Sequence, residues 1–198
     1  MSTTELQTDD GQPTSALLSR RTTLGAGLVS TIVTADPAAS VVLNSVVESL
    51  VKRSELQAKL FNSGEMLRWL AVADPGESFT LMQPFGGPTS HGFDRSPRHL
   101  GTLASMFRNG NATIELARAV ASDDGIVLVY IERQQIEVAG LPKQDWSLRV
   151  TQVFQREGAD WKLVHRHADP LVHPISLAVA AALASGKDLS VAPNQGTQ

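Results

Sequence analysis

The hydrophobic positions of residues 41–62 recur at steps of three and four, which is the spacing of one face of a helix. Leu43, Val46, Val47 and Leu50 form the apolar stripe, and charged residues fill the positions between them. The pattern predicts a long amphipathic helix that ends near Gly64, because glycine suits the left-handed position after a helix. Two shorter helices are expected over residues 65–70 and 97–107.

The second half of the chain changes to β-branched runs separated by turn residues. Asp123-Asp124-Gly125, residues 139–142 and residues 157–160 are the turns. Helices followed by hairpin-connected strands predict an α+β fold, a cone-shaped roll in which helices cover one face of a curved antiparallel sheet. The open end of such a cone is a natural pocket. The strands are expected over residues 79–83, 111–121, 126–138, 146–155 and 161–168.

The two ends of the chain differ from this central part. Residues 1–40 are expected to be disordered and contain Arg20-Arg21 before a short apolar run, the pattern of a twin-arginine export signal. This favours export to the periplasm or the medium, and the alternative is an N-terminal extension of a cytoplasmic protein. The run is too short for stable membrane insertion. Residues 175–198 predict an alanine-rich helix and a loose tail, which leaves residues 41–174 as the domain.

Composition excludes several classes of function. The formal net charge of −3 argues against a nucleic-acid binder, because no basic surface is available to neutralise phosphates. The chain has no cysteine, so disulfides, thiolate nucleophiles and sulfur-rich zinc sites are excluded.

Four segments carry a resemblance to a known family. The order of elements, together with these segments, resembles the SnoaL-like branch of the nuclear transport factor 2-like (NTF2-like) superfamily, and is similar to the association domain of calcium/calmodulin-dependent kinase. The resemblance covers residues 41–174, and the final two strands are its most specific part. It implies the ketosteroid-isomerase type of α+β roll, in a superfamily that includes isomerases, cyclases, dehydratases, binding modules and oligomerisation domains. The segments are residues 83–87, 130–133, 146–154 and 161–170.

The resemblance also suggests where a site would lie. Isomerases of this type use a carboxylate base and an oxyanion hole made by a tyrosine and a protonated carboxylic acid. Tyr130 is the one tyrosine of the chain, and no matching carboxylate pair can be placed on the strands. Kinase association domains carry arginines in the pocket, and the corresponding positions are identified as Glu132, Gln152 and Ala168.

The richest polar cluster is residues 165–169. Because side chains alternate along a strand, His165, His167 and Asp169 share one face of a regular strand. Such a set suits acid–base catalysis, since a carboxylate orients an imidazole that titrates near neutrality. It also resembles part of a metal site, but no further spaced ligand is evident, so no metal is predicted. The alternative is a structural role at the sheet end, and a β-bulge would decide which face meets the pocket.

Glu132 and Arg149 are the remaining charged candidates on the strands. Glu132 follows an apolar run, and a position inside the cone would suit it to general-base work. The alternative is an ion pair with Arg149 or Arg166 on a neighbouring strand. Arg149 is expected either to anchor a ligand carboxylate or to pair across the sheet.

Large apolar residues are expected to form the pocket wall, among them Trp69, Met82, Phe85 and Trp146. His91 follows the glycine-bearing corner at residues 86–87, and loops at a pocket mouth often carry function.

These observations favour a pocket protein that binds a small hydrophobic molecule. One hypothesis is an isomerase, cyclase or dehydratase that uses His165, His167, Asp169 and Glu132 on a hydrophobic carbonyl compound, without a cofactor. The alternatives are a binding module without catalysis and an association domain. A homodimer is compatible with each, because helices on one face leave the other face of the sheet to be buried.

Overall fold

The computed structural model describes residues 37–186 of the 198-residue chain. The proposed export signal lies outside the described residues, as does the tail after residue 186, and both stay predictions. No helix within the described part is long and apolar enough to cross a membrane.

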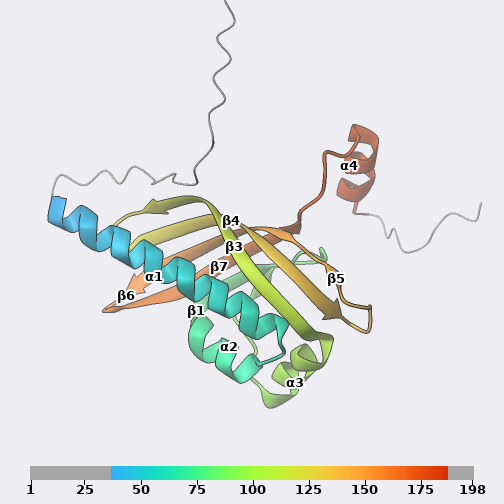
Figure 1. The fold of residues 1–198 in the computed structure, drawn as a ribbon, viewed down its shortest axis with the longest axis horizontal. Coiled ribbons are helices and arrows are strands. Elements are labelled where there is room, and N and C mark those ends of the chain that lie inside the picture. The colour runs from blue at the N-terminus through green and yellow to red at the C-terminus, as the bar shows by residue number, and fades with distance from the viewer. Residues whose placement is uncertain (1–36, 187–198) are drawn as a thin grey trace, which may run out of the picture.

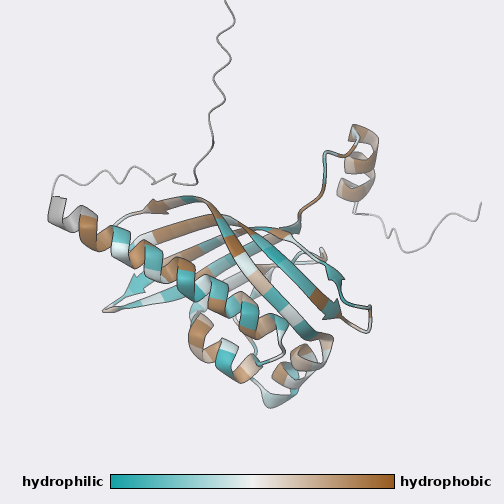
Figure 2. Ribbon diagram, viewed as in Figure 1, coloured by the Kyte–Doolittle hydropathy of each residue, from teal (hydrophilic) through white to brown (hydrophobic). Residues whose placement is uncertain are grey.

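The helices lie close to where the sequence placed them. The helix α1 (Pro37–Asn62) runs diagonally across the sheet, and α2 (Met66–Ala73) and α3 (Pro97–Met106) lie together at one end (Figure 1). The helix α3 begins at Ser96, whose side chain accepts a hydrogen bond from the backbone N–H of His99. Hydrophobic and hydrophilic residues alternate around α1, and its apolar stripe packs on the sheet (Figure 2).

The sheet has seven strands in the order β2-β1-β7-β6-β4-β3, with β5 paired to β4. Three hairpin connections give the antiparallel pairs β3–β4, β4–β6 and β6–β7. We expected an antiparallel sheet throughout, but β1 lies parallel to β7, so the sheet is mixed. A parallel pair needs a long connection, and residues 83–159 provide it between these two strands. The strands are β1 (Pro75–Met82), β2 (Ser90–His91), β3 (Phe107–Ala121), β4 (Gly125–Val138), β5 (Gln144–Asp145), β6 (Leu148–Glu157) and β7 (Asp160–Pro170).

A β-bulge in β7 changes which residues face α1. Leu163 pairs with Phe154 and His165 pairs with Val153, so Val164 is the extra residue. Before the bulge Leu163 points into the core, and after it the inward positions are Arg166 and Ala168. This single insertion decides which part of the 165–169 cluster reaches the interior.

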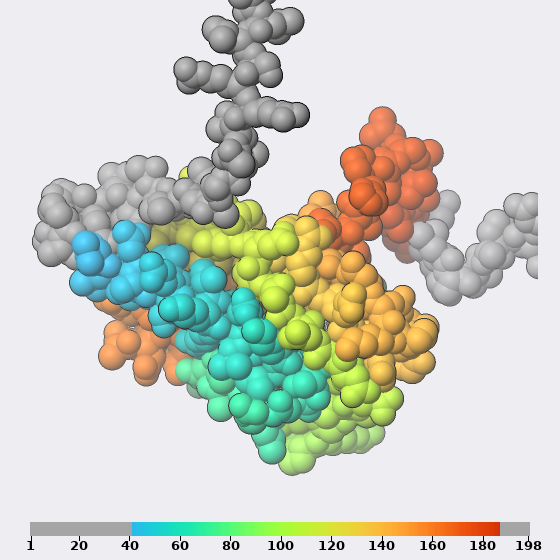
Figure 3. All heavy atoms as spheres, viewed as in Figure 1, coloured from blue at the N-terminus to red at the C-terminus, as the bar shows by residue number. Residues whose placement is uncertain are grey.

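The last helix, α4 (Leu177–Ala184), stands apart from the rest of the domain (Figures 1 and 3). None of its residues is buried, and Leu177 is 89% exposed. It lies within the alanine-rich segment for which a helix was expected.

Candidate functional site

A cavity of about 680 Å³ lies between α1 and the concave face of the sheet, and α2, α3 and the β1–β2 connection close its sides. Its volume falls within the range of small-molecule sites in proteins. Phe85, which is 50% exposed, stands at its edge against the rings of Phe107 and Trp146. The other aromatic walls are Phe61, Trp69, Phe79 and Phe93.

A charged pair lies in the polar wall of the cavity. Arg166 on β7 donates from Nη2 to Oε2 of Glu132 on β4 over 3.1 Å, and from Nη1 to the hydroxyl of Tyr130 over 3.1 Å. The side chain of Glu132 is 4% exposed and that of Arg166 is 20% exposed. Both residues line the cavity. The two charges cancel, so this wall carries no net charge.

Burial and nearby charges determine the protonation states of Arg166 and Tyr130. Burial acts to lower the pKa of Arg166, but the charge of Glu132 and the hydrogen bonds to Glu132 and Tyr130 outweigh it, and the pKa lies above the ordinary value. Burial raises the pKa of Tyr130, although Arg166 opposes the shift. Near neutral pH the wall therefore presents a guanidinium cation, with the neutral phenol of Tyr130 behind it.

Polar side chains of α1 form a second part of this wall. Ser54 donates from its hydroxyl to Oε1 of Gln152 over 2.7 Å, and Gln152 donates from Nε2 to Oε1 of Gln57 over 3.1 Å. All three are at least 97% buried. Nε2 of Gln57 is buried with no hydrogen-bond partner among the described residues.

A third group joins the end of α1 to β4. Asn62 donates from Nδ2 to Oε1 of Gln134 over 2.5 Å, and Gln134 donates from Nε2 to the backbone carbonyl of Trp146 over 2.8 Å. Asn62 and Gln134 are buried and line the cavity.

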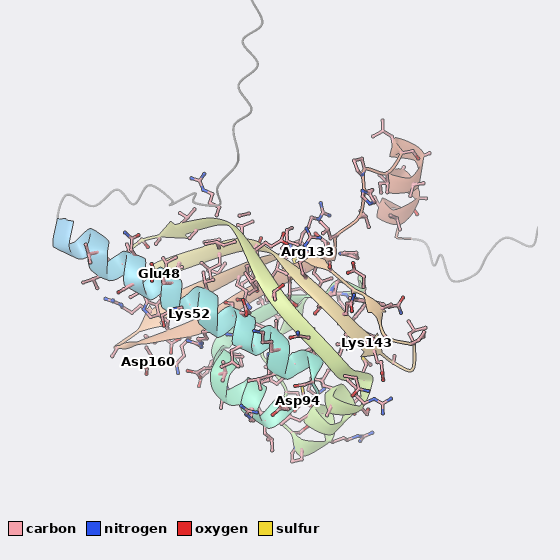
Figure 4. All side chains as sticks on the ribbon, viewed as in Figure 1. Glu48, Lys52, Asp94, Arg133, Lys143 and Asp160 are labelled. Carbon is pink, nitrogen blue, oxygen red and sulfur yellow. The ribbon has the colours of Figure 1, made fainter. Side chains whose placement is uncertain are left out.

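Three titratable side chains lie on the α3 side of the cavity, namely His91, Asp94 and His99. The ring of His99 packs edge-on against Phe93, with 5.5 Å between the ring centres. Asp94, which precedes α3 and is labelled in Figure 4, accepts a hydrogen bond from the backbone N–H of Ser96. That contact holds the pKa of Asp94 below its ordinary value, and nearby His99 contributes less.

The expected ligand-binding residues divide into two groups. Trp69, Phe85, His91, Trp146 and Gln152 line the cavity, as does Glu132. Of the two partners that the sequence left open for Glu132, Arg166 is the one it contacts.

Three other expected ligand-binding residues do not line the cavity. Tyr130 is buried behind its wall and reaches it through Arg166. Met82 is 42% exposed and pairs with His167 in the sheet. Arg149 lies on the outer face of the sheet, 3.9 Å from Asp169, which is the cross-sheet pairing that we expected as its alternative role.

The cluster expected to be catalytic does not reach the cavity. The bulge at Val164 turns His165, His167 and Asp169 to the outer face of the sheet, where Nδ1 of His165 lies 2.7 Å from the hydroxyl of Thr80. Nε2 of His167 lies 3.5 Å from Oδ1 of Asp169, and both side chains are partly exposed. Among the described residues, no group of three or more histidine, aspartate or glutamate side chains could hold a metal ion.

Several cavity residues were not expected from the sequence. Arg166 was expected only as an ion-pair partner of Glu132, and the bulge at Val164 is what brings its face of β7 to the cavity. Ser54 and Gln57 carry a visible signal, since they interrupt the apolar stripe of α1 at its own spacing. Asn62 carries the same signal, because it continues the four-residue spacing of Ser54 and Ala58. Gln134 shares the strand face of Ile136 and Val138. His99 gave no such signal.

Comparison with known proteins identifies the fold. No family model and no curated protein matches the chain. The chain is similar to a candidate dehydratase of the NTF2-like family from Streptomyces avermitilis, with a TM-score of 0.54 and 16% identity over 66% of this chain and 99% of that one. An NTF2-like protein with a cystatin-like fold from Novosphingobium aromaticivorans gives a TM-score of 0.52 and 18% identity, over 74% of this chain and 94% of that one.

The chain thus has the NTF2-like α+β fold, which confirms the resemblance at the level of the fold. The association domain of C. elegans CaMKII gives a TM-score of 0.48 and 11% identity over 65% of this chain and 98% of that one. Activity does not follow from a shared fold. The closer likeness to SnoaL-like proteins and association domains stays a prediction.

Proposed function

We propose that this chain is a pocket protein that binds a small, neutral, largely hydrophobic carbonyl compound. The observation that supports this most strongly is the cavity of about 680 Å³, which has aromatic walls and a compact polar region at Arg166 and Glu132. Ligand sites in proteins combine a mostly apolar surface with a few placed polar groups in this way.

The charges of the polar wall indicate the kind of ligand. Arg166 is neutralised by Glu132, so an additional anion gains little net attraction there. A guanidinium has five N–H donors, and contacts with Glu132 and Tyr130 involve two of its three nitrogens. The cavity-facing part of Arg166 is suited to donate to a carbonyl oxygen.

Binding can be tested by titrating the protein with 1-tetralone, a bicyclic ketone, in isothermal calorimetry. Leu103→Trp replaces a side chain of the cavity wall by a larger one and is expected to weaken the binding of 1-tetralone at least tenfold. The matched control is Leu67→Trp, because Leu67 lies on α2 with 75% exposure. If wild-type protein does not bind 1-tetralone, or if both variants bind it equally well, the proposed site is wrong.

A second candidate function is cofactor-free acid–base catalysis of the isomerase, cyclase or dehydratase kind. It is favoured by His91 and His99, whose imidazoles line the same cavity and are side chains of the kind that serve as general acids and bases. The similar protein from Streptomyces avermitilis is a candidate dehydratase, which agrees with chemistry of this kind.

Catalysis of this kind can be tested by following deuterium exchange at the α-carbon of 1-tetralone by NMR in D₂O. An enzyme accelerates the exchange in a saturable way, and His99→Asn reduces the acceleration at least tenfold. His173→Asn is the control, since His173 is exposed after β7. Binding of the ketone without accelerated exchange would support a binding module and reject the enzyme.

Dimerisation is proposed as an accompanying property. The outer face of the sheet exposes Val120 and Val129, and within residues 37–186 the helix α1 packs on the opposite face. Sedimentation velocity of wild-type protein is expected to give twice the monomer mass, and Val129→Lys is expected to return the monomer. A wild-type monomer at a protein concentration of about 0.1 mM would reject dimerisation but would leave the proposed binding pocket standing.

A further inference from the structure

The amide chain formed by Asn62, Gln134 and the carbonyl of Trp146 has only one possible direction. The backbone oxygen of Trp146 can only accept, so the group that approaches it from Gln134 must be the amide Nε2. The oxygen of Gln134 is then the acceptor that faces Asn62, and Asn62 must donate from Nδ2. The remaining atom, Oδ1 of Asn62, is therefore fixed as a hydrogen-bond acceptor.

This oxygen is in a position to meet a ligand. Among the described residues, the one hydrogen bond of the Asn62 side chain is the bond that Nδ2 donates to Gln134, so no residue there donates to Oδ1. It is also not among the sealed polar atoms, since within the described residues only Nε2 of Gln57 is both fully buried and unpartnered. Asn62 is 3% exposed, and it lines the cavity.

The backbone around Asn62 gives the acceptor a fixed position. Gly110 on β3 approaches so closely that a Cβ atom there would lie 2.8 Å from both Cβ and the carbonyl oxygen of Asn62. This contact positions the backbone and Cβ of Asn62, and the hydrogen bond to Gln134 orients its amide. A preorganised acceptor costs little to align when a ligand binds.

We infer that Oδ1 of Asn62 receives a hydrogen bond from a hydroxyl group of the ligand, which makes the ligand a hydroxylated member of the carbonyl compounds described above. The inference rests on the proposed function and adds a second polar group to the substrate class. Asn62 and Gln134 act together as the residues that determine specificity for this group. A buried acceptor rejects a ligand that cannot donate, because the acceptor then loses its water without gaining a partner.

Three matched probes test this inference on wild-type protein: 1-tetralone, 6-hydroxy-1-tetralone and 6-methoxy-1-tetralone, each titrated in isothermal calorimetry. The hydroxyl compound is expected to bind about tenfold more tightly than the methoxy compound, the effect of one well-formed buried hydrogen bond. Failure of all three to bind would overturn the proposed function and this inference with it. Binding of all three with equal affinity would overturn the inference and leave the proposed function standing.

Two variants separate the role of the acceptor from a general loss of packing. Asn62→Leu removes the acceptor and is expected to abolish the preference for the hydroxyl compound. Ile126→Ala is the control, because Ile126 is fully buried in the core and is not among the residues that line the cavity. It is expected to keep the preference. If Asn62→Leu does not fold, the comparison of the three probes on wild-type protein still decides the question.

Discussion

The ion pair between Glu132 and Arg166 allows a sharp test of how the polar wall is held together. Glu132→Gln keeps the size of the side chain and removes its charge. Breaking a fully buried pair costs about 3–5 kcal/mol, because it leaves one charge without compensation. Arg166 is 20% exposed, and glutamine can still accept a hydrogen bond from it. We therefore expect a loss of about 2 kcal/mol in the free energy of unfolding.

The assay is urea-induced unfolding followed by tryptophan fluorescence and circular dichroism. Glu115→Gln on β3 is a matched control, since the pair of Glu115 with Arg133 is exposed at 58% and 46% and contributes little. Arg166→Met added to Glu132→Gln removes the uncompensated cation and is expected to recover at least half of the loss. The reasoning would be refuted if Glu132→Gln cost no more than Glu115→Gln, or if Arg166→Met lowered stability further.

Two further predictions follow from the geometry. Gly110→Ala places a Cβ atom 2.8 Å from Asn62 and Ile136 and is expected to lower the free energy of unfolding by about 1–3 kcal/mol in thermal or urea unfolding. Gly101→Ala in α3 meets open space and is expected to raise it by up to about 1 kcal/mol. Equal effects of the two changes would contradict this reasoning. Burial, and then the charge of His167, lower the pKa of His165, so the native state binds this proton more weakly than the unfolded chain. The resulting stability is complete above about pH 6.5 and falls as the pH decreases below that value, and His165→Gln is expected to flatten this part of a stability–pH curve.

Local sequence patterns were enough to predict the elements and the fold class. The stripe of α1 is set by residues three and four apart, and the strands after residue 110 are separated by compact turn signals. Local patterns of this kind act over a few residues, so they are readable without a structure. The α+β roll followed from them, and composition added Trp69, Phe85 and Trp146 as residues of its pocket wall.

Only the tertiary structure decided which strand residues face the cavity. Residues 126–131 are apolar without interruption, yet Leu128 is buried and Val129 is 37% exposed, because α1 covers just one side of β4. One extra residue at Val164 sends Arg166 inward and His165 outward, and hydrogen bonding to β6 sets this register.

The polar wall was likewise invisible in the sequence as a unit. Asn62 and Gln134 are 72 positions apart, and Ser54 and Gln152 are 98 apart. A lone buried amide is costly, so each of these side chains is tolerated only where folding brings its partner to it. The chemistry of the cavity therefore depends on long-range packing, whereas the frame that holds it depends on local pattern.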